Sequence, residues 1–239
     1  MWDPSSWFMK YFSFDEKNNV LVYNNRLPMN KEKFYFENNI VPIKTPISLL
    51  LDKFKNNELF DVLCYLGEDK NPFYKLFIDH KNCVYNLALT DFKNKYQLIN
   101  FVNKYDVDNV NIFLNNDPSS MDACISNKQD LVIVYPKSTG FEKIRRYPDY
   151  LVKFNPNEID EIISNETKAL NGLSQYVRDN GALIYMVNTM NKKESHNVVL
   201  KFLETHRDFI LKDELQFLPN EENMIAFYYA IFEKVASND

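Results

Sequence analysis

From Thr45 onward, short apolar runs alternate along the chain with segments whose apolar residues recur at helical spacing. The runs have the length of buried strands, and the segments between them have the period of amphipathic helices. The runs cover residues 60–66, 83–89, 110–114, 131–135 and 181–187. Strands that alternate with helices predict a mostly parallel sheet with helices on both faces, joined by right-handed crossovers.

The predicted helices begin near residues 45 and 91 and cover 156–177 and 194–206, with a shorter apolar helical turn at 73–77. Two final apolar runs, 215–218 and 225–232, flank the turn-forming residues 219–223 and predict a closing antiparallel pair. Near the start, apolar residues on both sides of Asp15 to Asn19 predict a short hairpin. We therefore expect an N-terminal appendage over 1–35 and one α/β domain over 36–239.

Composition excludes several classes of protein. A chain of 239 residues with 45% hydrophobic residues is long enough to bury a core, and a net charge of −5 argues against coating nucleic acid through bulk charge. Three cysteines without metal-binding spacing suit buried thiols in a reducing compartment, so no metal site is expected. No apolar run is long enough to span a membrane, and the first ten residues do not resemble a signal peptide. We expect a soluble, cytoplasmic protein with no membrane contact.

Glycine is scarce, which limits the nucleotide sites that the chain can form. Only Gly67, Gly140, Gly172 and Gly181 occur, and neither GxGxxG nor GxxxxGK is present. A backbone that cradles phosphate usually needs two or three closely spaced glycines, because a Cβ obstructs the approach. A conventional nucleotide loop is therefore excluded.

The stretch from Gly181 to Val199 reads as a buried strand, a loop and an amphipathic helix. Ligands of doubly wound sheets bind outside the carboxyl ends of the strands, so Met186 to Met190 lies where a site is expected. An ordinary strand-to-helix connection is the alternative interpretation.

Upstream, Asp130 leads through Pro136 to Gly140 into Arg145-Arg146-Tyr147-Pro148-Asp149. Together with Gly181 to Leu203, this resembles the RsmB/Sun (NOP/Sun) family of S-adenosylmethionine-dependent RNA cytosine-C5 methyltransferases. That family has Asp-x-x-Leu-x-Asp-Ala-Pro-Cys-Ser-Gly and Arg-Arg-x-Pro-Asp, then Gly-x-Leu-Val-Tyr-Ser-Thr-Cys-Thr, Pro-Glu-Glu-Asn and Val-Val-x-x-Phe-Leu. The resemblance covers about residues 36–234 and implies a class I methyltransferase-like (Rossmann-like) fold with a seven-stranded sheet.

The resemblance also implies a chemistry that this chain lacks the residues to perform. A cysteine thiolate of the family adds to C6 of cytosine, so that C5 can accept the methyl group. Asn188 stands at the position of that cysteine, and Lys137 stands at the position of the second family cysteine, which assists release of the adduct. Val134 and Tyr135 replace the acidic residue of the same motif. We therefore assign no catalytic residue.

The cofactor site implied by the resemblance is also altered. Asp61 and Gly67 match the spacing of the family's Leu-Asp-x-Cys-Ala-Ala-Pro-Gly loop, and Asp117 follows the third strand where the family has an Asp. Glu68 and Asp69 add carboxylates where the methionine part of the cofactor would approach, and the ribose-holding acid is replaced by Ala88. We expect no cofactor, or weakly bound S-adenosylmethionine with Asp61, Gly67 and Asp117 as the remnant of its site.

A basic, aromatic loop is better preserved. Its cationic residues, which the resemblance assigns to RNA contact, are Lys137, Lys143, Arg145, Arg146 and Lys153. Tyr147, Tyr150 and Phe154 are interleaved with them and offer faces on which bases could stack. A solvated loop whose arginines form salt bridges is the alternative.

Three functional hypotheses remain. The first is a pseudo-methyltransferase that binds rRNA, tRNA or the ribosome as an assembly module. The second is an active S-adenosylmethionine-dependent methyltransferase on another acceptor, such as a nitrogen. The third is a non-catalytic subunit that stabilises a protein partner, which an exposed apolar patch near the former cofactor site would favour.

Overall fold

The structure is a computed structural model of the whole chain. The residues that it describes are 12–15, 20–23, 50, 52–54, 61–67, 73, 77, 82–90, 92–115, 117–118, 120–122, 125–145, 147–218 and 226–236. Residues 74–76 of the predicted helical turn, most of the predicted helix at 45–54 and the turn at 219–223 lie outside these residues. Of the helix near residue 45, the described part includes a short 3-10 helix, η2 (Asp52–Phe54).

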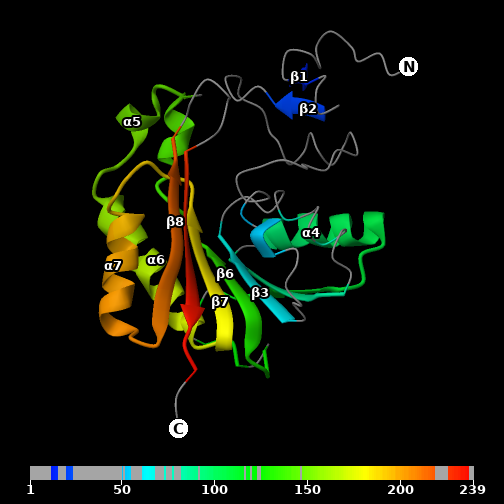
Figure 1. Cartoon of the computed structure of the whole chain (residues 1–239). Coiled ribbons are helices and arrows are strands. Elements are labelled where there is room, and N and C mark those ends of the chain that lie inside the picture. The colour runs from blue at the N-terminus through cyan, green and yellow to red at the C-terminus, as the bar shows by residue number, and fades with distance from the viewer. Residues whose placement is uncertain are drawn as a thin grey trace.

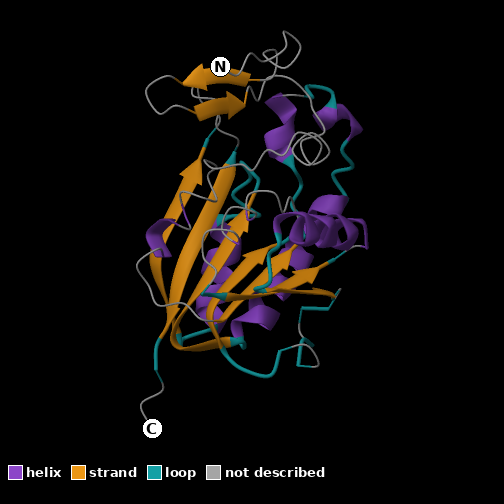
Figure 2. Cartoon of the chain, turned by 90° about the vertical axis from the view of Figure 1, so that its right-hand side faces the viewer, coloured by secondary structure: helices purple, strands orange, loops and turns teal. Residues whose placement is uncertain are grey.

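Seven strands form one sheet in the order β5-β4-β3-β6-β7-β9-β8. The strands are β3 (Asp61–Leu66), β4 (Val84–Leu89), β5 (Val110–Leu114), β6 (Gln129–Tyr135), β7 (Val177–Val187), β8 (Phe209–Phe217) and β9 (Phe227–Lys234). The strands from β5 to β7 pair in parallel, whereas β9 is antiparallel to both of its neighbours. Figure 2 shows the strands side by side across the molecule. This order confirms the predicted doubly wound, mostly parallel sheet with an antiparallel closing strand.

Helices cover both faces of the sheet (Figure 1). On one face lies α4 (Phe92–Tyr105), which buries Leu98 and Phe101. On the other face lie α6 (Glu158–Ser174) and α7 (His196–Thr205), which bury residues such as Leu170 and Val199. The central strands touch both layers, and for this reason β6 is buried along its whole length.

Shorter elements complete the description. A 3-10 helix, η4 (Phe141–Arg145), and a one-turn helix, α5 (Tyr150–Lys153), connect β6 to α6. Strands β1 (Phe12–Asp15) and β2 (Val20–Tyr23) form the predicted antiparallel hairpin, separate from the main sheet. No helix in the described part of the chain has the length and apolar character needed to cross a membrane.

The boundary between α6 and β7 differs from the prediction. The sequence pattern continues the helix to Val177, but α6 ends at Ser174 and Val177 is the first residue of β7. Val177 pairs with Gln129 of β6, and the register shifts before the next pair, Leu131 with Ala182. A fully buried valine fits the apolar face of a helix and the inside of a strand equally well, so periodicity could not separate the two.

Candidate functional site

In the sheet, β3 lies between β4 and β6. The chain runs from β3 to β4 and β5 on one side and then returns to form β6 on the other side of β3. The strand order therefore reverses between β3 and β6, where the carboxyl ends of these two strands lie next to each other. In folds of this type the crevice at this switch point is where ligands bind. β3 ends at Leu66 and is followed by Gly67, β6 ends at Tyr135, and β7 is followed by Asn188. The structure therefore brings the segments that the sequence singled out to one edge of the sheet.

Asn188 lies buried at this edge, with 6% of its surface exposed. Its Nδ2 donates a hydrogen bond of 2.5 Å to the hydroxyl of Tyr135, which is itself 1% exposed. The resemblance places the family's nucleophilic cysteine at Asn188 and the family's acidic residue at the position of Val134 and Tyr135. Both positions are thus occupied by side chains that bond to each other, and neither carries the thiol that the family's chemistry uses.

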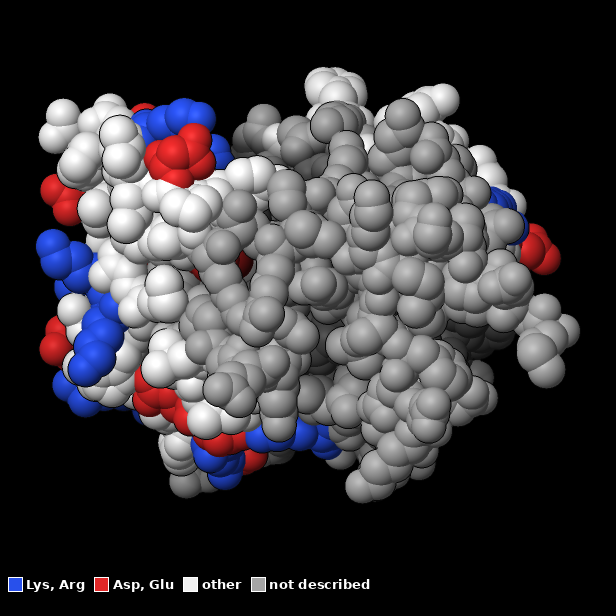
Figure 3. All heavy atoms as spheres, turned by 90° about the horizontal axis from the view of Figure 1, so that it is seen from above, with Lys and Arg blue, Asp and Glu red and all other residues white. Residues whose placement is uncertain are grey.

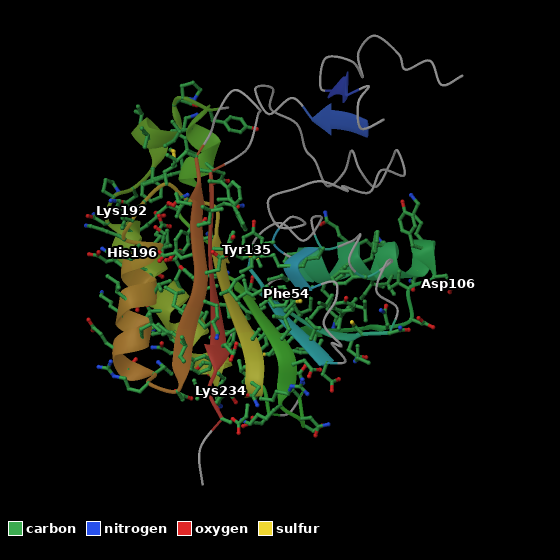
Figure 4. The ribbon with its side chains drawn as sticks, in the orientation of Figure 1. Phe54, Asp106, Tyr135, Lys192, His196 and Lys234 are labelled. Atoms are coloured by element: carbon green, nitrogen blue, oxygen red, sulfur yellow. The ribbon has the colours of Figure 1, made fainter. Side chains whose placement is uncertain are left out.

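The ring of Tyr135 fills space on the α4 side of the sheet. It packs against the buried ring of Phe73, with 6.1 Å between the ring centroids. Figure 4 labels Tyr135 together with Phe54, and both belong to the apolar cluster on that face. Tyr135, which stands with Val134 in place of the family's acidic residue, therefore serves as part of the core.

Glu194 connects the two loops that flank Asn188. It is fully buried, and its carboxylate accepts hydrogen bonds from the Thr139 amide (2.6 Å), the Thr139 hydroxyl (2.7 Å) and the Thr189 hydroxyl (2.8 Å). The hydroxyl of Tyr185 donates to the Glu194 backbone carbonyl at 2.6 Å. We refer to Thr139, Thr189 and Glu194 as the loop clasp.

The loop clasp was not identified from the sequence, because its partners lie 55 residues apart. One signal was available: Glu194 falls in the stretch that resembles the family's Pro-Glu-Glu-Asn segment. Further bonds support the same loops. Ser138 donates from its hydroxyl to the Asn188 carbonyl at 3.3 Å, and the Tyr150 hydroxyl donates to the Thr139 carbonyl at 2.6 Å. The backbone around Asn188 is therefore held in place by side chains other than its own.

Asp61 and Gly67, both predicted remnants of a cofactor site, lie at opposite ends of β3. Six residues of extended strand separate them by about 20 Å. At the amino end, the Asp61 amide donates to the carboxylate of Asp130 at 2.8 Å, and Asp130 also pairs with Arg178. A ligand at the carboxyl edge would contact Gly67 and not Asp61.

The lack of a side chain at Gly67 is explained by contacts within the chain. A Cβ at this position would lie 2.6 Å from the backbone nitrogen of Lys137 and 3.0 Å from the carbonyl carbon of Pro136. The Gly67 amide also donates to the Tyr135 carbonyl at 2.8 Å. Gly67 thus allows β3 to approach the loop after β6, and its presence does not by itself indicate a cofactor.

The other predicted cofactor positions are divided between surface and core. Asp117 is exposed after β5, and its backbone amide donates a hydrogen bond of 2.6 Å to Asn115 Oδ1. The pKa of Tyr65 is raised mainly because Tyr65 is buried, and the charge of Asp117 raises it further. Ala88 is completely buried within β4, so it cannot touch a ribose. Glu68 and Asp69 lie outside the described residues. The described residues at the end of β4, Leu89 and Thr90, offer no carboxylate to the ribose hydroxyls of S-adenosylmethionine.

The cysteines do not replace the missing nucleophile. Cys64 is completely buried in β3, where desolvation raises the pKa of its thiol far above the usual range. Burial also raises the pKa of Cys83, which lies next to the amino end of β4. Cys124 lies outside the described residues. A thiol with a raised pKa holds little thiolate, so neither described cysteine is suited to attack a base.

The predicted RNA-binding residues are described in part. Lys137 is exposed directly after β6, and Lys153 is exposed in α5, where it pairs with Asp149 and lowers the pKa of that carboxyl. The backbones of Lys143 and Arg145 lie in η4, but their side chains and the whole of Arg146 lie outside the described residues. Viewed from above, the described basic and acidic side chains are intermixed (Figure 3).

A polar network near α7 was also missed. His196 Nδ1 lies 2.7 Å from Glu214 Oε1, which also accepts a hydrogen bond of 2.6 Å from the Tyr228 hydroxyl. The sequence offered no carboxylate at useful spacing from His196, because Glu214 comes from β8 and reaches it only through the fold. His196 lies at the start of α7 in Figure 4, on the opposite side of the sheet from α4, and is not part of the edge around Asn188.

Several known proteins are similar to this chain. A probable ribosomal RNA small subunit methyltransferase B of Bacillus subtilis is 26% identical over 184 residues, which cover 73% of this chain and 40% of that protein. A ribosomal RNA small subunit methyltransferase F of Escherichia coli O157:H7 is 26% identical over 97 residues, 41% of this chain and 19% of that protein. The chain thus spans less than half the length of these relatives.

Solved structures show the same fold. The protein named PH0851 superposes with a TM-score of 0.76 at 16% identity, over 93% of this chain and 54% of that one. NSun6 from Pyrococcus horikoshii superposes with a TM-score of 0.62 at 11% identity, over 74% of this chain and 48% of that one. The family model described as 16S rRNA methyltransferase RsmB/F matches residues 48–233, which is well over half of the sequence. With the strand order and the motifs around Pro136 and Asn188, this match shows that the chain belongs to the RsmB/F family of RNA methyltransferases.

Proposed function

We propose that this protein binds RNA, either rRNA, tRNA or RNA within the ribosome, as a binding or assembly module that does not methylate cytosine C5. The observation that carries the proposal is Asn188, which is buried and bonded to the Tyr135 hydroxyl at the position of the family's nucleophile. The family's chemistry requires a covalent bond to C6 of the base, and this bond requires a thiolate. An RNA-binding role also agrees with the predicted cytoplasmic location.

Binding of S-adenosylmethionine is proposed to be weak. Gly67 packs against the backbone of Pro136 and Lys137, and Tyr135 occupies the neighbouring core. When bound, the cofactor would supply an electrophilic methyl group, and Gly67 and Asp117 are the remaining residues near it. An enzyme that transferred this methyl group to another acceptor would still need tight cofactor binding, so weak binding argues against that alternative.

Recognition of RNA is assigned to the loop from Lys137 to Lys153. Lys137 and Lys153 are exposed there, and Tyr147 is 41% exposed with its ring available for stacking. The loop clasp and the bond from Tyr150 to Thr139 fix the start of this loop, so its exposed side chains project from a rigid base.

Docking of a protein partner is the second candidate, and α5 favours it. Leu151 is 54% exposed and Val152 is 88% exposed, beside the exposed Tyr147. Adjacent exposed apolar side chains often mark contact surfaces. Replacing Leu151 and Val152 with serine separates the two candidates, because it removes an apolar contact and leaves every cation of the loop in place.

The proposal is tested with RNA that contains 5-azacytidine, which traps an enzyme thiolate as a stable adduct. We expect the wild-type protein to bind this RNA in a native gel but to form no complex that survives denaturation. A matched control replaces Lys137 and Lys153 with glutamine and should weaken the native complex. A denaturation-resistant adduct, or no RNA binding at all, would contradict the proposal.

A further inference from the structure

The outward face of α4 carries exposed aromatic side chains that no part of the site uses. Phe92 is 80% exposed, Tyr96 is 68% exposed and Ile99 is 37% exposed. At 100° per residue these three lie within about 60° of arc around the helix. Leu98 and Phe101 point the opposite way, into the core under α4. The exposed stripe is therefore separate from the face that holds the helix on the sheet.

Charge distinguishes this stripe from an ordinary apolar contact surface. From Phe92 to Tyr105 the sequence contains three lysines and no Asp or Glu, although the chain as a whole has a net charge of −5. Lys95 is half-buried and Lys104 is exposed. By helical geometry they lie on opposite sides of the stripe, and the positive end of the helix dipole adds to the field near Phe92. The remaining polar residues are Asn and Gln, which can bond to base edges.

Two aromatic rings one turn apart, with Lys95 between them in the sequence and Lys104 farther along the same helix, match the chemistry of single-stranded nucleic acid. Bases stack on exposed rings while lysines contact the phosphates, and every base has a face to stack. The charged side chains within α4 are all lysines, which suits a polyanion, and Asp91 and Asp106 flank the helix in the sequence.

We propose that Phe92 and Tyr96, with Lys95 and Lys104, form a second contact surface for single-stranded RNA. It rests on the proposed function, because it takes RNA as the ligand, and it adds a site on a different element from the loop of Lys137 to Lys153. Phe92 follows the carboxyl end of β4, so both surfaces start from the same edge of the sheet. A strand bound at the loop could thus continue onto α4.

The test measures fluorescence anisotropy of a labelled single-stranded RNA of about 12 nucleotides, within the usual site size for such surfaces. Replacing both Phe92 and Tyr96 with alanine should weaken binding by about tenfold or more. Replacing Lys95 and Lys104 with glutamine should reduce the slope of log affinity against log salt by about 0.7 for each lysine that contacts phosphate. Phe92→Tyr, which keeps the ring, should bind as the wild type does.

Ile99→Ala is the matched control, since it removes an apolar side chain of the same stripe that cannot stack. An equal loss in Ile99→Ala and in the double alanine variant would overturn the proposal in favour of apolar docking. Unchanged binding in the double variant, with weaker binding when Lys137 and Lys153 are replaced, would overturn this inference alone. If the wild type does not bind, the proposed function fails as well. Thermal unfolding of each variant checks that the fold is retained.

Discussion

At the level of single residues, Asn188 and Tyr135 form a bonded pair at the carboxyl edge of the sheet. Both side chains are almost completely buried, and their hydrogen bond joins the ends of β7 and β6. The carbonyl oxygen of the Asn188 side chain is buried without a hydrogen-bond partner. The pair therefore contributes one satisfied bond and one buried polar atom that lowers the net gain.

The first prediction concerns this bond. Tyr135→Phe should lower the free energy of unfolding by about 1–3 kcal/mol, because it leaves the buried amide of Asn188 without its acceptor. Asn188→Ala should be destabilising for the reciprocal reason. The double variant should lose less than the sum of the two single variants, because neither polar group is then left unpaired. Urea unfolding of the four proteins measures the coupling, and strictly additive losses would contradict the bond.

The cysteine position supplies a second prediction. Asn188→Cys alone should not produce 5-methylcytosine, because Lys137 still occupies the second family cysteine position and the described cofactor edge is unchanged. Mass spectrometry of nucleosides from RNA incubated with this variant and S-adenosylmethionine gives the answer. Methylation restored by the single substitution would show that the rest of the site is functional.

At the level of elements, two groups of side chains hold together segments that no sheet hydrogen bonds join. One is the loop clasp, and the other is an ion pair between η2 and β8. Glu194 holds the loop after β6 against the loop after β7, and Lys53 contacts both Asp213 of β8 and the Tyr229 hydroxyl of β9. The first group is buried and the second is partly exposed, so the clasp should contribute more to stability.

Glu194→Ala should reduce the free energy of unfolding by about 3 kcal/mol or more, since two threonine hydroxyls and one amide lose a charged acceptor. The exposed Glu204 of α7 provides the control, and its replacement with alanine should change stability by less than about 0.5 kcal/mol. Hydrogen exchange at the Thr139 amide reports on the loop itself, and protection unchanged in Glu194→Ala would contradict the clasp.

The ion pair predicts a dependence on pH. The hydrogen bond from Lys53 lowers the pKa of Asp213, so the folded state favours the charged carboxylate. Its contribution is present above the ordinary Asp pKa of about 3.9 and is lost as pH falls below it, through the lowered value. Asp213→Asn should therefore be less stable than the wild type at pH 7, by less than about 1 kcal/mol because both groups are partly exposed. Unfolding curves at pH 7 and pH 2 should show the difference vanishing at the lower pH.

For the molecule as a whole, the sequence predicted the arrangement of the sheet more completely than the contacts of the site. Strands such as β6 are buried on both faces, so an uninterrupted apolar run such as Leu131 to Tyr135 was sufficient to locate them. Val177 was misplaced because a buried valine is compatible with either element. Such local patterns predict where a helix or strand lies in the sequence, but they do not predict which side chains of different elements come into contact.

The geometry of the site could not be predicted, because it depends on contacts between residues that lie far apart in the sequence. Glu194 bonds to Thr139, and Tyr135 reaches Asn188, only after separate strands align. The resemblance to the family identified Asn188 and Gly67 as important positions, yet only the structure showed that Gly67 is required by a close backbone approach and that Asp61 lies at the other end of its strand.

The protein as a whole has a methyltransferase fold in which Tyr135 and Asn188 lie buried at the carboxyl edge of the sheet, and Lys137 and Tyr147 are exposed in the segment that follows β6. The decisive measurement is the amount of 5-methylcytosine formed when the wild-type protein is incubated with RNA that it binds and with excess S-adenosylmethionine. We expect none above the level of a protein-free control, together with retained RNA binding in the same mixture. Formation of 5-methylcytosine in proportion to the protein added would contradict the proposed function.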